Sequence, residues 1–180
     1  MKKIRVWSCG TAFGQEAYSV AILFCEILGN DIEDFDIKIS ATDIDKNALE
    51  HAPWGSYDKK VLRNMGPNLL FKYFTRLNDR YVVSDRVRVL VSFERHDVVS
   101  SFPKHGMDII LCRNLLIYFQ KALQEKVLQN LHHTLNPEGF LILGKTESLP
   151  YQMKDCFKAV DLQERVYRKK MISSLQSAGL

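Results

Sequence analysis

Residues 7–19 read WSCGTAFGQEAYS, and this stretch decides the fold. The apolar, β-branched residues 3–8 predict a buried strand, which Gly10 and Gly14 follow. From Gly14 onward, apolar residues recur at helical spacing as far as Gly29, a residue typical of a helix end. A strand that turns through glycines into a helix forms either a ligand-holding loop or only a tight corner. The stretch alone leaves both possibilities open.

The alternation of strand and helix continues beyond this stretch. Residues 36–41 predict a second strand, which runs into the carboxylates of Asp43 and Asp45. Asp45 is placed to cap a following helix, and Pro53 lies beyond the end of that helix. The order strand, helix, strand, helix predicts an α/β fold with a doubly wound, mostly parallel sheet.

Residues 54–92 interrupt the alternation and predict a small inserted β-subdomain. Residues 69–74 have helical spacing. Residues 81–83 and 87–93 are predicted to be two strands joined by a turn at 84–86, with mostly antiparallel local pairing.

The α/β alternation then resumes. Residues 107–112 predict an apolar strand and residues 120–135 a helix, followed by a turn at 136–139 and a strand over 140–143. Residues 157–169 are expected to supply the last, antiparallel edge strand, centred on 165–168.

Composition bounds the class of protein. The chain has 180 residues, 46% apolar and 26% charged, which fits one globular domain and excludes a disordered or fibrous chain. No stretch reaches the roughly 20 apolar residues of a membrane span, and no signal peptide is visible. The net charge of +4, without a Lys/Arg tract, gives no case for nucleic acid but favours an acidic partner.

Metal binding is not expected. The pair His132-His133 is predicted to lie on a helix, facing solvent or making a local bond, with no partner ligands at suitable spacing. The cysteines form no CxxC pair and are expected to be free thiols in a reducing cytoplasm. They are Cys9, Cys25, Cys112 and Cys156.

Chemically useful residues follow the predicted strands, where doubly wound folds bind ligands. They are Gly10, Gly14, Glu16, Asp43, His96, Asp97, Arg113, Asn114 and Tyr118. An acid one βαβ unit after a glycine turn is placed to accept hydrogen bonds from ribose hydroxyls. The loop is neither GxGxxG nor a P-loop, and Glu16 would repel a pyrophosphate. A carboxylate there suits a nucleoside ligand with a positive end, such as S-adenosylmethionine.

Each of these residues also has a structural alternative. Gly10 and Gly14 could serve only the turn, and Asp43 could cap the next helix. Glu16 in a first helical turn gains from the helix dipole. Arg113 has little packing role directly after the apolar strand, which favours a functional one.

The loop resembles a family signature. WSCGTAFGQEAYS is similar to WSAGCSTGEEPYS of the CheR family, the chemotaxis receptor glutamate O-methyltransferases. The resemblance spans nearly the whole chain in order. It continues through ATDID (41–45), A-x-x-G-x-Y (52–57), YF (73–74), V-x-F with H-D-V (91–98), CRNLLIYF (112–119) and L-x-P-x-G-x-L-x-L-G-x-x-E (135–147).

The resemblance implies a Rossmann-like class I S-adenosylmethionine-dependent methyltransferase fold. Its sheet is mostly parallel and seven-stranded, with an antiparallel edge strand and a small β-subdomain inserted at about 54–92. The expected catalytic domain covers 1–170, followed by a C-terminal tail at 171–180. Family enzymes carry an N-terminal helical domain, which the chain is expected to lack.

The resemblance also implies an activity and site residues. The cofactor would be S-adenosylmethionine, leaving as S-adenosylhomocysteine, and the products would be glutamate γ-methyl esters. The partner would be the cytoplasmic domain of a chemoreceptor, a methyl-accepting chemotaxis protein, or a related signalling protein, which implies a cytoplasmic location. Catalytic roles fall on Arg113 and Tyr118, which would orient the acceptor carboxylate. Cofactor contacts fall on Gly10, Gly14, Glu16, Asp43 at the ribose, Asp97 and Val98 at the adenine, Arg113 and Asn114.

The loop departs from the signature at Thr11, Phe13, Gln15 and Ala17. The ring of Phe13 could pack behind the cofactor loop or block it. Two other functions therefore stay open: a weak or inactive CheR-like remnant that binds cofactor or a signalling partner, and a methyltransferase for a small carboxylate.

Overall fold

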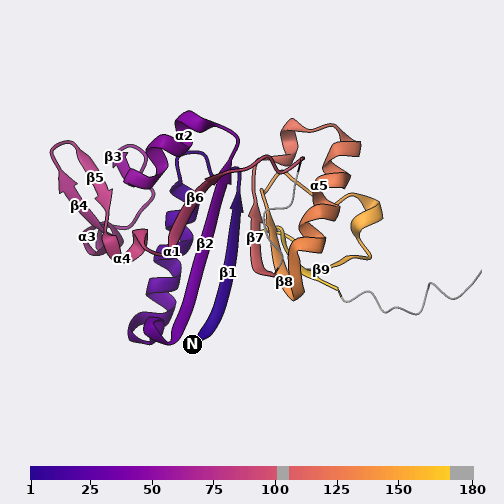
Figure 1. The fold of residues 1–180 in the computed structure, drawn as a ribbon, viewed down its shortest axis with the longest axis horizontal. Helices are drawn as coiled ribbons and strands as arrows, with labels where there is room; N and C mark the ends of the chain where they lie inside the picture. Colours follow the sequence, from indigo (N-terminus) through magenta and orange to yellow (C-terminus); the bar gives the residue numbers. More distant parts are fainter. Residues whose placement is uncertain (101–105, 171–180) are drawn as a thin grey trace, which may run out of the picture. The chain divides into compact units, whose positions relative to one another are not determined.

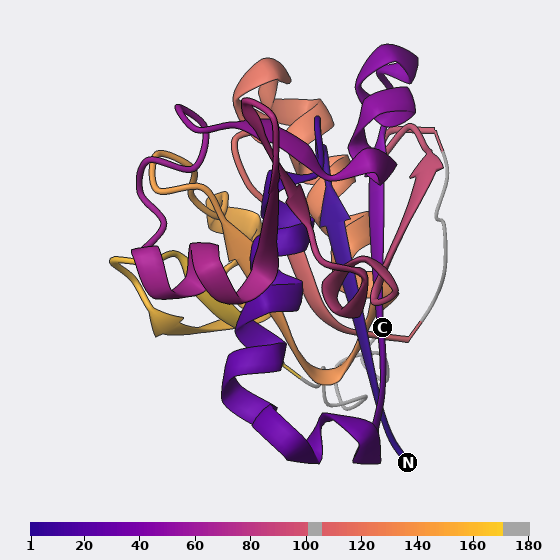
Figure 2. The ribbon, with the colours of Figure 1, turned by 90° about the vertical axis from the view of Figure 1, so that its left-hand side faces the viewer.

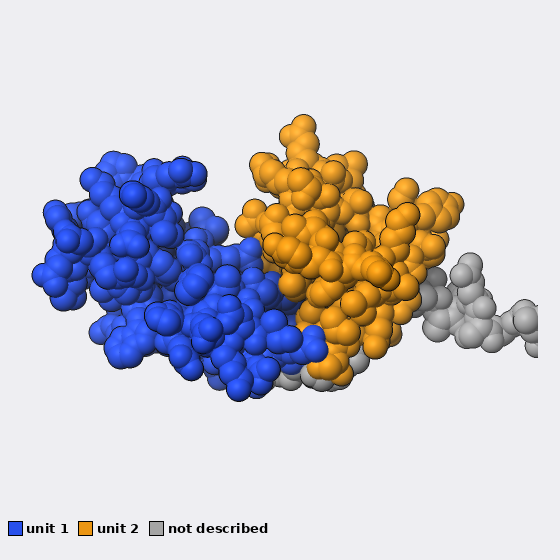
Figure 3. All heavy atoms as spheres, turned by 90° about the horizontal axis from the view of Figure 1, so that it is seen from above, with its two compact units in different colours: residues 1–97 blue, residues 98–180 orange. Residues whose placement is uncertain are grey.

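The computed structural model describes residues 1–100 and 106–170, so the predicted tail at 171–180 lies outside the described residues. The chain forms two compact units, Met1–Asp97 and Val98–Leu180 (Figure 3). The seven strands of the main sheet are divided between them. The first unit contributes β6-β2-β1, and the second contributes β7-β8-β10-β9, in that order. The predicted α/β class, with a mostly parallel sheet and an antiparallel edge, is confirmed.

The first unit is built on three parallel strands. They are β1 (Lys2–Cys9), β2 (Phe35–Asp43) and β6 (Val91–Arg95), with β2 pairing with both others in parallel. The helix α1 (Gln15–Leu28) runs beside β1 and β2 (Figure 1), as the view turned by 90° also shows (Figure 2). The end of α1 at Gly29, with a φ of 54°, is confirmed.

The helix α2 (Lys46–His51) begins where the sequence predicted it. The Asp45 carboxylate accepts hydrogen bonds from the N–H groups of Asn47 and Ala48 at 2.9 and 3.3 Å. These bonds satisfy two of the backbone donors that a helix start leaves without partners. Asp45 is therefore the cap of α2, which leaves Asp43 for another role.

A small antiparallel sheet occupies the predicted insertion. Its strands are β3 (Ser56–Asp58), β4 (Phe74–Leu77) and β5 (Arg80–Val83), in the order β3-β5-β4. The helix α3 (Pro67–Tyr73) precedes β4, in agreement with the helical spacing of that segment.

The predicted strand at 81–83 is confirmed as β5, but its predicted pairing across a turn at 84–86 with a strand at 87–93 is wrong. The helix α4 (Asp85–Arg88) follows β5 directly, and β6 then pairs with β2 in the main sheet. Val87 is fully buried on α4, and the Leu90 carbonyl accepts a hydrogen bond from the Ile39 N–H at 2.9 Å. The alternating valines Val87, Val89 and Val91 predicted one strand, but only Val91 belongs to β6.

The second unit contains four strands of the main sheet. Its parallel pair is β7 (Met107–Cys112) and β8 (Leu135–Leu143), and the helix α5 (Lys121–Thr134) connects them as predicted. β8 begins five residues earlier than expected, because the predicted turn at 136–139 is an irregularity within the strand, with Glu138 at a φ of 66°.

The antiparallel end of the sheet has two strands where one was predicted. β10 (Val166–Lys169) pairs with β8 on one side and with β9 (Phe157–Asp161) on the other. The predicted edge strand at 165–168 is therefore an inner strand, and β9 forms the edge. The alternation of charged and apolar residues in β10 is typical of an edge strand, but β9 pairs with its outer side.

Among the described residues, no helix is both long and apolar enough to cross a membrane. The four cysteines are free, as predicted. The prediction that both histidines of α5 face solvent or bond locally is wrong for His132, which is only 6% exposed and packs against the Phe157 ring at 5.1 Å. His133 is exposed, and its Nδ1 lies 2.8 Å from the Gln129 carbonyl.

Candidate functional site

The loop between β1 and α1 has an unusual backbone. Gly10, Ala12 and Gly14 all have left-handed φ values, 69°, 48° and 85°. Glycine adopts such angles readily, whereas for another L-residue they cost about 1–2 kcal/mol. Ala12 therefore keeps its conformation only because its surroundings impose it. The tight turn explains the two glycines. Whether the loop has a further role depends on the interactions that hold the Ala12 backbone.

Asp43 fixes Ala12 from the end of β2. One carboxylate oxygen of Asp43 accepts the Ala12 N–H at 2.7 Å, and the other accepts the Asp45 N–H at 3.0 Å. The Thr42 carbonyl accepts hydrogen bonds from the N–H groups of Gly10 and Thr11 at 2.9 and 3.0 Å. A carboxylate has room for about four hydrogen bonds. The two bonds described here leave acceptor capacity on Asp43.

Glu16 lies in the first turn of α1 and is held from β1. Its Oε1 accepts a hydrogen bond of 2.7 Å from the hydroxyl of Ser8, which is fully buried. The positive end of the helix dipole stabilises this carboxylate. Glu16 thus has a fixed position at the carboxyl end of β1. The sequence does not reveal this constraint, because Ser8 occupies an ordinary strand position.

Asp97 follows the third strand end of the first unit. The N–H of His96 donates to the Asp43 carbonyl at 3.0 Å, and the His96 ring meets Trp7 edge-on at 5.6 Å. Asp97 comes next and is half-buried. The structure therefore brings Gly10, Glu16, Asp43 and Asp97 to the carboxyl ends of β1, β2 and β6. Three carboxylates on neighbouring strand ends favour a positively charged ligand.

Phe13, the bulkiest departure from the signature, lines a separate pocket. Its ring is 48% exposed and meets the His51 ring edge-on at 6.4 Å. With Trp54 and Arg80 it lines a pocket of about 520 Å³, of which neither Glu16 nor Asp43 forms part. The ring therefore lies on the side of the loop that faces this pocket.

In the second unit, the predicted residues follow the end of β7. Arg113 and Asn114 are exposed, and Asn114 has a left-handed φ of 56°. Tyr118 is 78% exposed at the end of a short 3₁₀ turn, Leu116–Tyr118, whose Leu116 is buried. An arginine and a tyrosine hydroxyl exposed on one short arm, residues 113–118, suit an anionic ligand. Val98, also in this unit, is buried.

Glu147 holds the backbone of this arm, a role that the motif ending at Glu147 (135–147) did not reveal. It is only 4% exposed, and its carboxylate accepts N–H groups from Gly144, Asn114 and Leu116 at 2.7, 2.9 and 2.8 Å. A Cβ at Gly144 would lie 2.7 Å from Glu147 Oε2 and 2.9 Å from the backbone nitrogen of Asn114, so only glycine fits there. The available signal was a carboxylate three residues after Gly144, the glycine that directly follows β8, at the end of the motif over 135–147.

Comparison with known proteins identifies relatives of this arrangement. The family described as "CheR methyltransferase, SAM binding domain" matches residues 1–166. A chemotaxis protein methyltransferase of Vibrio parahaemolyticus is 38% identical over 152 residues, 82% of this chain and 55% of the relative. A probable chemotaxis protein methyltransferase of Rhizobium etli is 31% identical over 173 residues, 93% of this chain and 64% of the relative.

A third relative is an uncharacterized 104.1 kDa protein of Rhodobacter capsulatus. It is 32% identical over 165 residues, which are 92% of this chain and 17% of that protein. The chain therefore spans between about half and two thirds of the chemotaxis methyltransferases, and a much smaller part of this long protein.

The residues of the first unit fit S-adenosylmethionine. Asp43 has acceptor capacity for ribose hydroxyls, and the fixed carboxylates suit the positive charges of the ligand. The buried hydroxyl of Thr11 has no hydrogen-bond partner within the described part of the chain. Such an orphaned polar atom in a loop of strained backbone is unusual for a purely structural corner.

Proposed function

The chain belongs to the CheR methyltransferase family, whose cofactor is S-adenosylmethionine, and we propose that it methylates glutamate side chains of chemoreceptors. The product would be a glutamate γ-methyl ester, and the acceptor would be the cytoplasmic domain of a methyl-accepting chemotaxis protein or a related signalling protein. A cytoplasmic location is part of this proposal.

The observation that supports an anionic acceptor most directly is the arm at 113–118. It exposes Arg113 and Tyr118, while the buried Glu147 carboxylate holds its backbone through Asn114 and Leu116. A guanidinium can hold a carboxylate through two parallel hydrogen bonds, and a phenol can add a third. We assign Arg113 and Tyr118 to orienting the acceptor carboxylate.

We assign Asp43 to the ribose hydroxyls, Glu16 to the positively charged end, and Asp97 to the adenine, all three from the first unit. Gly10 and Gly14 shape the loop. Val98 and Asn114 belong to the second unit, and only the family resemblance assigns them to the cofactor. When bound, S-adenosylmethionine supplies a methyl group on a positively charged sulfur and leaves as S-adenosylhomocysteine.

The chemistry needs no general base from the chain. A glutamate side chain is already ionised at neutral pH, so its oxygen carries the electron pair that forms the new bond. The residues of the site have to align this oxygen and exclude water, which can lower the barrier substantially through proximity alone.

A methylation assay tests the proposal. The 180-residue chain is incubated with methyl-labelled S-adenosylmethionine and the cytoplasmic fragment of a methyl-accepting chemotaxis protein. The expected product is a label on glutamate that mild alkali releases as methanol, the behaviour of an ester. Calorimetry with S-adenosylhomocysteine runs in parallel. Binding without receptor labelling would overturn the receptor assignment in favour of a binding remnant, or of a small-carboxylate methyltransferase if free carboxylates are labelled instead.

A further inference from the structure

The small sheet reaches the loop at 10–16 through one hydroxyl. The Tyr57 OH, on β3, donates a hydrogen bond of 2.8 Å to the carbonyl of Phe13. These residues lie 44 positions apart in the chain. Phe13 lies between Ala12 and Gly14, two of the three left-handed residues that give the loop its shape.

Tyr57 is itself held firmly. Tyr57 on β3 pairs with Tyr81 on β5, and its side chain is buried. Gly55, with a φ of 56°, precedes the strand and accepts the Val83 N–H at its carbonyl at 2.9 Å. The ring meets Tyr18 edge-on at 6.4 Å. The hydroxyl therefore has a defined position from which to hold the loop.

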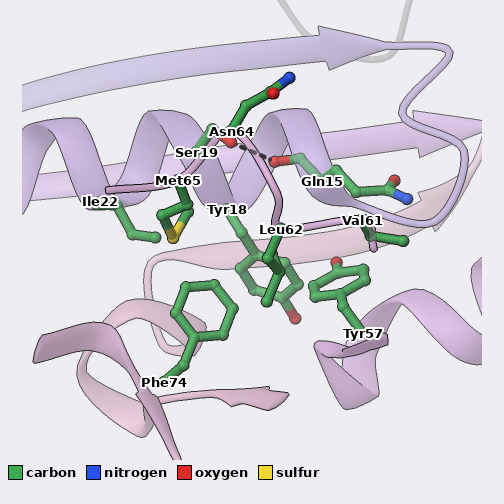
Figure 4. A pocket seen from close by; sticks show the side chains of 10 residues that line it. All are labelled: Gln15, Tyr18, Ser19, Ile22, Tyr57, Val61, Leu62, Asn64, Met65 and Phe74. Atoms are coloured by element: carbon green, nitrogen blue, oxygen red, sulfur yellow. Dashed lines mark hydrogen bonds between the residues drawn. The ribbon is translucent and has the colours of Figure 1, made fainter. Parts of the chain in front are cut away.

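Tyr57 also lines a pocket beside α1. Figure 4 shows the rings of Tyr18, Tyr57 and Phe74 side by side along it, with Gln15 of α1 above Tyr57. The pocket measures about 210 Å³. Burial raises the pKa of both tyrosines, Tyr18 to about 12, so both hydroxyls stay protonated and remain donors at neutral pH.

We infer that Tyr57 is a positioning residue for cofactor binding, acting by holding the loop at 10–16 in its binding conformation. Asp43 fixes the loop at Ala12, and Tyr57 fixes it one residue later at Phe13. Without the second bond, the left-handed conformation at Ala12 is less strongly imposed, and a smaller fraction of molecules has the loop ready for the ligand. Apparent affinity falls by that fraction. This inference rests on the proposed cofactor role of the loop.

The chain offers a matched control. The Tyr18 hydroxyl is buried beside the same pocket and donates to the carbonyls of Ala52 and Pro53 at 3.1 and 3.3 Å, not to the loop. Tyr18→Phe and Tyr57→Phe therefore each delete one buried hydroxyl from neighbouring rings. Only the second deletion removes a contact to the loop.

The test measures the affinity for S-adenosylhomocysteine by calorimetry, together with the amide exchange of Ala12 and Gly14 and the melting temperature. Tyr57→Phe should weaken binding about three- to tenfold and speed exchange in the loop. Tyr18→Phe should lower the melting temperature similarly while leaving affinity and loop exchange as in the parent chain.

The outcomes separate this inference from the function on which it rests. If the parent chain does not bind S-adenosylhomocysteine, the cofactor assignment of the loop fails. If the parent binds and Tyr57→Phe binds equally well, Tyr57 has no positioning role. Equal losses of affinity in both variants would also overturn the inference, because they would show a general effect of deleting a buried hydroxyl.

Discussion

A hydrogen bond of 2.7 Å joins the backbone N–H of Ala12 to the carboxylate of Asp43, 31 residues further along the chain. It connects the loop after β1 to the end of β2, at a residue whose φ of 48° is disfavoured without such support. The other oxygen of the carboxylate accepts the Asp45 N–H. Each Asp43 oxygen therefore accepts a backbone N–H, from Ala12 and from Asp45, so the side chain must have two acceptor oxygens.

Asp43→Asn should weaken the binding of S-adenosylhomocysteine about ten- to hundredfold, because the amide keeps only one acceptor oxygen and loses the charge. The measurement is calorimetry. Asp45→Asn is the matched control, since asparagine caps a helix about as well as aspartate, and its affinity should equal that of the parent. Similar affinities for the two variants would contradict the role of Asp43.

Arg113→Ala should lower kcat/KM for the protein acceptor at least about tenfold while leaving affinity for S-adenosylhomocysteine within about twofold. The reason is that a cation orienting the acceptor carboxylate contributes to transfer and little to cofactor binding. Lys158→Ala, which removes an exposed cation from β9, controls for net charge. A parallel loss of turnover and cofactor affinity in Arg113→Ala would refute this assignment.

Glu147→Ala should lower the free energy of unfolding by about 3 kcal/mol or more, because it leaves several buried N–H groups without an acceptor. Glu147→Gln should cost about 1–3 kcal/mol, since its amide group would face N–H donors. Urea denaturation measures both.

The control for Glu147 is Glu164→Gln, which removes an exposed carboxylate paired with Lys145 and should change stability by no more than about 0.5 kcal/mol. Comparable effects at the two positions would show that the Glu147 carboxylate does not hold the arm.

Stability should fall as the solution is acidified through about pH 6.5, in part because of His132. Burial, with the positive charge of Lys169 nearby, holds the pKa of His132 below its ordinary value of 6.5. The folded chain therefore keeps this imidazole neutral where the unfolded chain binds a proton. The stability that neutral His132 contributes is complete above about pH 6.5. It is lost progressively as the pH falls from there to the lower pKa of His132 in the folded chain.

The measurement is the free energy of unfolding between about pH 8 and about pH 5. His132→Phe should flatten this dependence. His133→Gln, at an exposed position on the same helix, should reduce it only in part, because the charge of His133 is a smaller cause of the lowered His132 pKa. An unchanged slope in His132→Phe would assign the pH dependence to other groups.

The sequence predicted well wherever periodicity and local capping decide the structure. The strand, the glycine turn and the helix around residues 7–19 required only spacing and glycine chemistry, and Asp45 was recognisable as a cap from its position. The predictions failed where distant pairing decides. Residues 81–93 divide between two sheets because β6 has β2 as a partner, which no local pattern reveals.

The candidate site divides in the same way. Charged residues directly after strands were identifiable, because strand ends in doubly wound folds bind ligands. The roles of the residues that hold these charged groups in place were not identifiable from the sequence. Ser8 reads as an ordinary strand residue, and Tyr57 and Glu147 act through hydrogen bonds to backbone groups that lie far away in the sequence.

The bond from Tyr57 to Phe13 bears on how members of this family can be recombined. A chimaera that exchanges residues 56–83 for the small sheet of a relative would also exchange the hydroxyl beneath its own loop. Unless the relative's sheet also places a hydrogen-bond donor within reach of the Phe13 carbonyl, the chimaera would fold but bind its ligand more weakly. The insertion and the loop are best transplanted together.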